Sequence, residues 1–471
     1  TYRAEGGYDY TFFQHWYGPR SSKAVQDGQG LPMGEWTKKD SWKLRAAHTL
    51  TWKQKFNKIH DVNIMIGQEY VASNSESNEM IGKFFQEDIT PEKMFASMAA
   101  NSGATGSRTI SSQLGQEDRT ISFFGRANYS LMDRYLLTFT IRADGSSKFT
   151  KGNRWGYFPA AAFAWRIIEE PFMEPVKEFM SNLKLRLSYG TAGNNRIGNS
   201  LYETSYKAYS SGKYYGAGGE QNPHYTLNNE QLANPDLKWE TTITRNIGLD
   251  FGFFNERLTG NIDYYWNTVK DLLIEQSITA IGYKTMQQNI GQTSNRGVEL
   301  TLNAAILQKK DYSLNFNFNK NKVDKLANGI SSMSYNSGAF SSDMRGRDDY
   351  RVIVGEPLGI VWGYVYDGVY GVDDFVTYTD ENGKTQFQFD KSGNYILKEG
   401  VTDNTYTTAS SYGGLRPGAM KLKDQDGDHK ITEKGDRVII GRTQPKFTGG
   451  FGLSGNYKWF DISANFNFVV G

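Results

Sequence analysis

The sequence predicts an all-β protein, namely an antiparallel transmembrane β-barrel with long extracellular loops. Three observations lead to this prediction. Apolar and polar side chains alternate along many segments, which gives a strand one apolar face and one wet face. Several of these segments are about ten residues long, the length that a tilted strand needs to cross a bilayer. Short turns and long polar stretches connect them, as in outer-membrane barrels.

The alternating segments follow one another along the whole chain. The predicted strands are 42–53, 243–253, 258–266, 298–306, 312–319 and 460–470. In the first of them, Trp42, Leu44 and Trp52 alternate with Lys43 and Arg45. Because side chains on a strand point to opposite faces in turn, each segment presents one face suited to lipid and one suited to water.

The connections fall into two classes of length. Short turns are predicted at 57–61, 132–133, 255–256, 308–311 and 457–459, and long polar stretches at 72–118, 197–238 and 321–442. We expect the short turns on the periplasmic side and the long stretches outside the cell. Residues 169–182 should contain a short helix. A second helix should begin at Thr90, because Pro91 and Glu92 follow it as they follow an N-cap. The longest stretch should carry further hairpins, at 351–354 and 361–370.

Composition agrees with a membrane barrel. Aromatic residues make up 14% of the 471 residues, and there are 50 glycines but only 11 prolines. An aromatic content this high is expected of a barrel that has a girdle of aromatic residues at each membrane interface. Proline lacks the N–H that a strand ladder needs, so paired strands avoid it. No apolar run approaches the roughly 18 residues of a membrane-spanning helix, which excludes a helical membrane protein.

Charge and cysteine content exclude other classes of protein. The chain has no cysteine, which excludes thiol catalysis, disulfide frameworks and cysteine-ligated metal sites. Its 53 Lys and Arg residues nearly match its 51 Asp and Glu residues, and the two signs are interspersed. No nucleic-acid partner is therefore expected.

Several motifs occur in a fixed order along the chain. They are RADGSSKF at 142–149, WGYFP at 155–159, LKLRLSYG at 183–190, NPDLKWETT at 234–242, NIG at 289–291 and NRGVEL at 295–300. In sequence and spacing they resemble the SusC/RagA family of TonB-dependent outer-membrane nutrient importers. The resemblance runs through most of the chain from about Arg119 onward.

The resemblance implies a 22-stranded barrel, located in the cell outer membrane, that is plugged by an N-terminal domain. It implies TonB-dependent active import of glycans or oligopeptides. It also implies two protein partners: a SusD-like lipoprotein that covers the barrel, and TonB, which pulls on the plug. We expect residues 1–471 to be part of such a barrel with its extracellular loops. We expect the plug domain, the TonB box and the last strands to be absent from this chain.

An acidic segment at 424–436 resembles an EF-hand calcium loop, because carboxylates at alternate positions can converge on one hard cation. The residues assigned to it are Asp424, Asp426, Asp428, Lys430, Thr432 and Asp436. The segment departs from the pattern at His429, where glycine usually makes the sharp turn, and at Gly435, where glutamate usually closes the shell. The alternative is a solvated acidic turn without a metal.

No enzyme is predicted. The chain has five histidines, with no HExxH pair and no GxSxG elbow. A GxGxxG match at 450–455 is followed by another alternating strand rather than by the helix that holds a pyrophosphate, so we interpret it as a glycine-rich strand. Tyrosines between 202 and 215 could stack on sugars or peptides, or pack within the loop.

Two other functions remain possible from the sequence alone. One is a surface glycan-binding β-protein without transport activity, which would share the aromatic residues and the alternation. The other is a hydrolase embedded in a barrel. The sorting of loops by length favours import over the first, and the missing catalytic motifs argue against the second. The sequence does not separate glycan from peptide cargo.

Overall fold

The computed structural model describes residues 1–17, 32–86, 89–98, 108–208, 225–278, 282–307, 310–325, 332–335, 350–405, 414–457 and 459–471. It divides into two compact units. The first contains residues 1–290 and 302–305, and the second contains residues 291–301 and 306–471. Strands dominate both units. In the described residues, no helix has the length and apolar character needed to cross a membrane.

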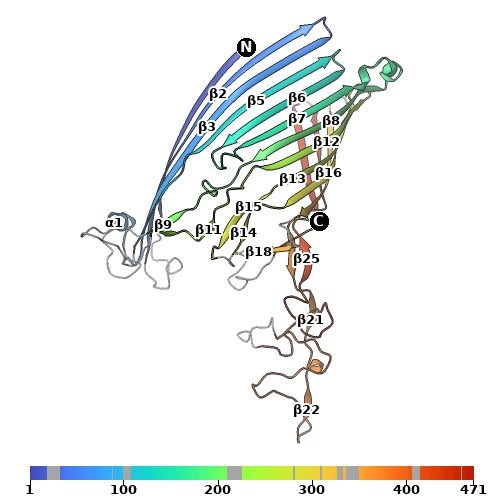
Figure 1. Cartoon of the computed structure of the whole chain (residues 1–471). Coiled ribbons are helices and arrows are strands. Elements are labelled where there is room, and N and C mark those ends of the chain that lie inside the picture. Colours follow the sequence, from blue (N-terminus) through green and yellow to red (C-terminus); the bar gives the residue numbers. More distant parts are fainter. Residues whose placement is uncertain are drawn as a thin grey trace, which may run out of the picture. The chain divides into compact units, whose positions relative to one another are not determined.

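The first unit is built around one antiparallel sheet whose long strands lie side by side (Figure 1). Its strands are β1 (Tyr2–Tyr17), β2 (Gly34–Phe56), β3 (His60–Gly82), β5 (Asp118–Leu131), β6 (Tyr135–Ser146), β7 (Trp155–Arg166), β8 (Met180–Asn194), β12 (Glu240–Phe253) and β13 (Leu258–Lys270). Each strand pairs with the next in this order. Such a meander is the topology of an up-and-down barrel wall, so this part of the prediction is confirmed.

Short turns join these strands at one end of the sheet. Non-glycine residues with positive φ make them, for example Asn57 (47°), Asp133 (54°) and Asn255 (53°). A tight turn between right-twisted strands needs this left-handed conformation, which Asn and Asp tolerate better than most residues. The turns predicted near 57–61, 132–133 and 255–256 are thereby confirmed. The turn predicted at 308–311 lies partly outside the described residues.

The connection from β7 to β8 contains the helix predicted within 169–182, in the tighter 3₁₀ form. It consists of η2 (Ile167–Glu169) and η3 (Pro171–Val176). Proline at the first position of η3 has no N–H to leave unpaired. This connection closes the same end of the sheet as the short turns.

The stretch 72–118 was predicted as a loop, and this is wrong for much of its length. β3 continues to Gly82, and β4 (Arg108–Leu114) pairs with its outer end. Polar side chains occupy both faces here, so apolar alternation gives no signal, but the backbone ladder continues without it. The predicted helix is confirmed as α1 (Pro91–Ala96), with Thr90 Oγ1 accepting a hydrogen bond from the Lys93 N–H at 3.4 Å.

Short strands carry the loops of the first unit. They are β9 (Tyr206–Ala208), β10 (Tyr225–Leu227), β11 (Gln231–Leu232), β14 (Leu273–Ser277) and β15 (Thr285–Asn289). Two small buried clusters anchor the loop end. One contains Phe149, Phe158, Leu237 and Trp239, and the other contains Phe85, Met94 and Met98.

The second unit contains further long strands and a set of short hairpins. The long strands are most of β16 (Gln292–Leu307), β17 (Lys310–Lys325), β26 (Phe447–Tyr457) and β27 (Phe460–Val470). The short elements are β18 (Ser332–Tyr335), β19 (Tyr350–Ile353), β20 (Ile360–Gly363), β21 (Tyr366–Val369), η6 (Val372–Asp374), β22 (Thr377–Thr379), β23 (Thr385–Phe387), β24 (Met420–Leu422) and β25 (Val438–Arg442). The strand predicted at 351–354 is confirmed as β19, which pairs with β20. The strand predicted at 361–370 is divided into β20 and β21, which belong to different sheets. The GxGxxG match lies in strand β26.

The apolar face of the first unit's sheet is not covered by a second layer in the described residues. Large apolar side chains along it are exposed, including Ile66 at 57% and Phe139 at 51%. A soluble sandwich would bury this face against another sheet. Within the described residues of the first unit, the structure therefore shows no stacked-sheet arrangement of the kind that a soluble β-protein would need.

Candidate functional sites: the two faces of the barrel wall and the acidic loop

One face of the first unit's sheet is a continuous apolar surface. Strand register places Leu50, Ile66, Gly125 and Ile141 directly opposite one another across four strands. Direct partners point to the same face, so the apolar side chains of successive strands adjoin. An uncovered surface of this kind is stable against hydrocarbon and not against water.

A stacked pair of aromatic residues lies on this face at the short-turn end. Tyr135 and Trp165 stack with ring centroids 6.4 Å apart. The Tyr135 hydroxyl and Trp165 Nε1 both donate to Glu170, at 2.5 and 2.9 Å, and Arg134 lies 3.5 Å from the same carboxylate. The hydrogen bonds from Tyr135 and Trp165 lower the pKa of Glu170. Rings with an apolar body and a hydrogen-bonded polar tip suit a membrane–water interface.

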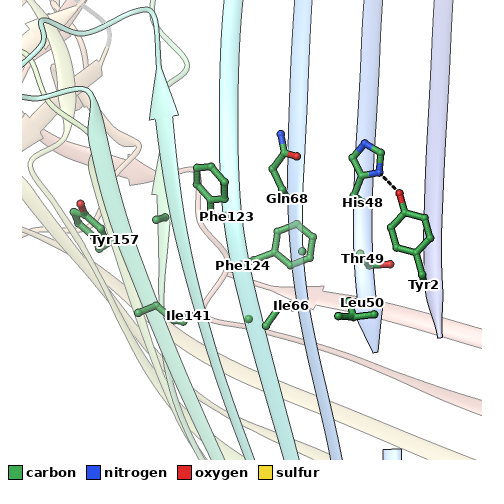
Figure 2. A pocket seen from close by; sticks show the side chains of 13 residues that line it. Tyr2, His48, Thr49, Leu50, Ile66, Gln68, Phe123, Phe124, Ile141 and Tyr157 are labelled. Atoms are coloured by element: carbon green, nitrogen blue, oxygen red, sulfur yellow. Dashed lines mark hydrogen bonds between the residues drawn. The ribbon is translucent and has the colours of Figure 1, made fainter. Parts of the chain in front are cut away.

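Hollows interrupt the apolar face where small residues occur. One of them has a volume of about 650 Å³, and Figure 2 shows Ile66 and Ile141 among the side chains that line it. Gly125 also lines it, and a Cβ there would meet no atom closer than 3.8 Å. At its rim the Tyr2 hydroxyl hydrogen-bonds His48 Nδ1 at 2.7 Å. His48 is therefore a polar residue on the apolar face.

The opposite face carries networks of paired charges. Arg142 contacts Glu69 at 3.1 Å, Asp144 at 2.7 Å and the Ser122 hydroxyl at 2.8 Å. Arg45 lies 2.6 Å from the same Glu69. These residues come from four neighbouring strands of the sheet, and the register gathers them on one face. A wall of this composition is suited to a water-filled interior.

A second network on this face depends on a glycine. Arg186 reaches Asp250 at 2.8 Å and Asp263 at 2.9 Å, which lie on the next two strands. Gly248 lies between them, and a Cβ there would come within 2.7 Å of the Arg186 guanidinium and 2.5 Å of Asp263. Glycine thus gives the guanidinium room to cross β12. Sequence reasoning missed both networks, because alternation identifies the wet face but not which charges meet on it.

The acidic loop (residues 424–436) lies in the second unit. Carboxylate oxygens of Asp424, Asp426 and Asp436 all lie within 4.8 Å of one another, whereas Asp428 is outside this group. Asp428 accepts a hydrogen bond from the Lys430 N–H at 2.7 Å. Thr432 Oγ1 lies 3.5 Å from Asp436. The structure therefore brings together the first, second and last of the predicted carboxylates.

Backbone geometry at the loop explains the departure from the calcium motif. His429 has φ = 62°, the left-handed conformation that glycine supplies at this position of an EF-hand loop. The N–H of His429 donates to Asp424 at 2.8 Å, and that of Thr432 to the fully buried Asp436 at 2.7 Å. Asp436 thus lies in the loop although Gly435 occupies the twelfth position.

The carboxylates of the loop differ in acidity. Burial would raise the pKa of Asp424, but backbone N–H groups of Gly427 and His429 donate to it and hold the pKa below its ordinary value. Asp426 accepts from the Asp428 N–H, which lowers its pKa. Burial and repulsion from the neighbouring carboxylates outweigh this, so the pKa of Asp426 is raised. Calcium binding by the acidic loop stays a prediction.

Loop tyrosines near 202–215 are described only in part. Tyr202 and Tyr206 lie in described segments, whereas residues 209–224 lie outside them. Burial and the charge of Glu203 raise the pKa of Tyr202. A role of this group in binding substrate stays a prediction.

Comparison with known families decides which class of barrel this is. A model of the family described as "TonB dependent receptor-like, beta-barrel" matches residues 1–468. The chain belongs to the TonB-dependent receptor β-barrel family. It is therefore part of an outer-membrane β-barrel, and its family consists of transporters rather than enzymes. The predicted resemblance, fold class and location are confirmed.

Curated relatives place the chain within this family. It is 39% identical over 292 residues to TonB-dependent receptor SusC of Bacteroides thetaiotaomicron, covering 59% of this chain and 27% of that protein. It is 32% identical over 428 residues to TonB-dependent receptor P3 of Formosa agariphila, covering 90% of this chain and 38% of that protein. The chain spans well under half the length of these relatives.

Among solved structures, the chain is similar to the RagAB peptide transporter. The TM-score is 0.72 at 23% identity, and the match covers 100% of this chain and 46% of that one. This likeness shows the fold. Together with the SusC relative, it supports a TonB-dependent transporter of the SusC/RagA type.

Proposed function

We propose that the protein containing this chain imports glycans or oligopeptides across the outer membrane, driven by TonB and assisted by a SusD-like lipoprotein. The observation that supports import is the two-faced wall of the first unit. One face is apolar and uncovered, and the other carries hydrogen-bonded charge networks such as that of Arg142. A protein that only bound glycans at the surface would need no wall with hydrocarbon on one side and water on the other.

The charge of the wet face bears on the class of cargo. In the networks of Arg142 and Arg186 each guanidinium pairs with two carboxylates, so neither presents an unpaired cation. Paired charges produce little long-range field of one sign. Such a wall suits cargo with no large net charge, which includes neutral glycans and peptides with balanced charge.

Among the similar proteins, the name of one supports the peptide class of cargo. One relative is the TonB-dependent receptor SusC, and one structure is that of a peptide transporter, RagAB. We keep glycan and oligopeptide cargo as the two alternatives within the proposal.

Uptake in cells tests the proposal. The complete gene is expressed together with the gene of a candidate SusD-like lipoprotein, in a strain lacking both. Fluorescent glycans and fluorescent oligopeptides are then supplied separately. We expect one class to accumulate in the periplasm, and accumulation to stop when TonB is deleted while surface binding persists. Surface binding without accumulation in any strain would favour the binding protein and contradict import.

A further inference from the structure

A groove on the apolar face contains a charged side chain, that of Arg245, which the proposed import does not use. It has a volume of about 690 Å³ and lies over β5, β6, β7, β8, β12 and β13. Small residues such as Ala127, Ala161 and Ala162 line it, together with apolar side chains that include Phe139 and Leu187. Its lining contains no carboxylate. The only formally charged lining residue is Arg245.

Arg245 lies on the apolar face by register. It pairs with Tyr189, which pairs with Ala161, which pairs with Phe139, and direct partners share a face. The guanidinium carbon lies 5.9 Å from the centre of the Tyr189 ring. Trp266 lines the same groove on the neighbouring strand. Two aromatic residues therefore flank the cation, which is an arrangement that favours a cation near hydrocarbon.

Arg245 has no acidic partner among the described residues. Its one polar contact to a side chain is a long hydrogen bond to Thr268 Oγ1 at 3.4 Å. This contrasts with Arg142 and Arg186 on the wet face, where each guanidinium contacts two carboxylates. A guanidinium facing lipid is costly unless an anion or water reaches it, and the described residues supply no anion to Arg245.

The height of Arg245 in the membrane indicates where that anion lies. Arg245 is eight residues from Phe253, the end of β12 at the short-turn side. At about 3.3 Å per residue and a tilt of about 40°, this is roughly 20 Å above the periplasmic interface. The apolar band of such a barrel is about 25 Å tall. A long arginine side chain can extend from this height to the head groups of the outer leaflet.

We propose that this groove binds one phosphorylated lipid of the outer leaflet, with an acyl chain over Ala161 and its phosphate paired with Arg245. Charge complementarity supports an anion, since the only formal charge in the groove is positive. The apolar lining supports an acyl chain rather than a free phosphate. Arginine can bind phosphate through two parallel hydrogen bonds, which fixes the lipid in place.

Native mass spectrometry of the complete protein, purified from its outer membrane in mild detergent, tests this proposal. The variants are Arg245→Gln, Arg245→Lys, Ala161→Phe and a matched control, Arg126→Gln. Arg126 also contacts a threonine, with Nε 3.3 Å from Thr140 Oγ1, but it lies on the wet face. Heat-modifiable migration on a gel confirms that each variant is folded.

We expect the wild type and Arg126→Gln to retain one phosphorylated lipid per protein. Arg245→Gln should lose about tenfold or more of this lipid, the usual result of removing a charge-assisted hydrogen bond to phosphate. Arg245→Lys should retain part of it, and Ala161→Phe should lose it with the charge intact. Equal retention by Arg245→Gln, or equal loss by Arg126→Gln, would overturn the proposal. Displacement of the lipid by added inorganic phosphate would show a simple anion site and overturn it as well.

Discussion

The two faces of the first unit's sheet use the same backbone ladder for opposite environments. Ile141 and Arg142 are neighbours in the chain, yet one is an exposed apolar residue and the other holds a network of carboxylates. Cross-strand register repeats this separation on the membrane-crossing part of the strands beside β6. The comparison teaches that the face to which a strand position points, more than the type of residue there, decides how much a substitution destabilises the barrel.

Arginine substitutions at two adjacent residues, one on each face of the sheet, test this comparison most directly. Phe139 lies on the apolar face and Thr140 on the wet face. Phe139→Arg should destabilise the folded barrel by about 2–4 kcal/mol, the cost of arginine near the bilayer midplane. Thr140→Arg should cost less, about 1 kcal/mol, because it removes the hydrogen bond from Arg126 and places two cations on directly paired residues, but in water.

Urea unfolding of the complete protein in lipid vesicles measures both free energies of unfolding. If the two variants were equally stable, the face assigned to hydrocarbon would be wrong. If only Thr140→Arg were destabilising, the result would instead favour the stacked sheets of a soluble β-protein.

Removing a partner from the wet-face network should have the next largest effect. Arg186→Met leaves Asp263 without its cation and Asp250 with only the longer contact to Lys184 at 3.8 Å, and Asp263 is only 8% exposed. We expect a loss of about 2 kcal/mol, below the range for fully buried pairs because the Arg186 side chain is 31% exposed. The same unfolding assay measures it.

Arg126→Met is the matched control for that substitution. Arg126 is exposed on the same face, and its hydrogen bond goes to a hydroxyl rather than a carboxylate. We expect it to change the free energy of unfolding by less than about 0.5 kcal/mol. A loss as large as that of Arg186→Met would mean that paired charges contribute nothing specific to the wall.

Much of the wall could be predicted from sequence because period two is a local signal. Segments such as 243–253 carry it within one strand, and turn residues such as Asn57 and Asn255 mark where strands end. Polar strand ends could not be predicted in this way. The outer part of β3 and its partner β4 have no apolar alternation, and only pairing with another strand reveals them.

Sites that depend on register could not be predicted from one sequence. Arg142 and Glu69 are 73 positions apart, and nothing local links them. Arg245 likewise becomes unusual only once Tyr189 and Ala161 are known to lie beside it. The acidic loop was predictable because its carboxylates lie within one short segment. Asp436, however, stands one residue beyond the last ligand position of the motif. Only the fold shows that its carboxylate still lies close to those of Asp424 and Asp426.

Calcium titration compares the acidic loop with an acidic turn that has no carboxylate cluster. Asp426→Asn should weaken calcium binding by about tenfold, because it removes one charged oxygen ligand from the shell. The control is Asp390→Asn, since Asp390 serves a turn by accepting the N–H groups of Ser392 and Asn394. Isothermal titration calorimetry of the complete protein measures both affinities.

The pH dependence of this binding sharpens the same prediction. The pKa of Asp426 is raised, so protonation of this carboxylate begins at a higher pH than for an ordinary aspartate. Calcium affinity should therefore be full at neutral pH and fall as the pH approaches that raised value. An affinity equal in wild type and Asp426→Asn would leave the solvated acidic turn as the correct interpretation.

The smallest expected effect concerns the strained residue of the acidic loop. His429 has φ = 62°, and its side chain is 61% exposed. His429→Gly should stabilise the loop by about 0.5 kcal/mol, because glycine adopts this conformation without a Cβ penalty, although it gains more entropy when unfolded. Hydrogen exchange at the Ile431 N–H, which donates to the Asp403 carbonyl at 2.8 Å, measures local opening. Lys430→Gly, next in the chain but without positive φ, should instead speed exchange there. Faster exchange in His429→Gly would mean that the histidine ring, and not its backbone, holds the turn.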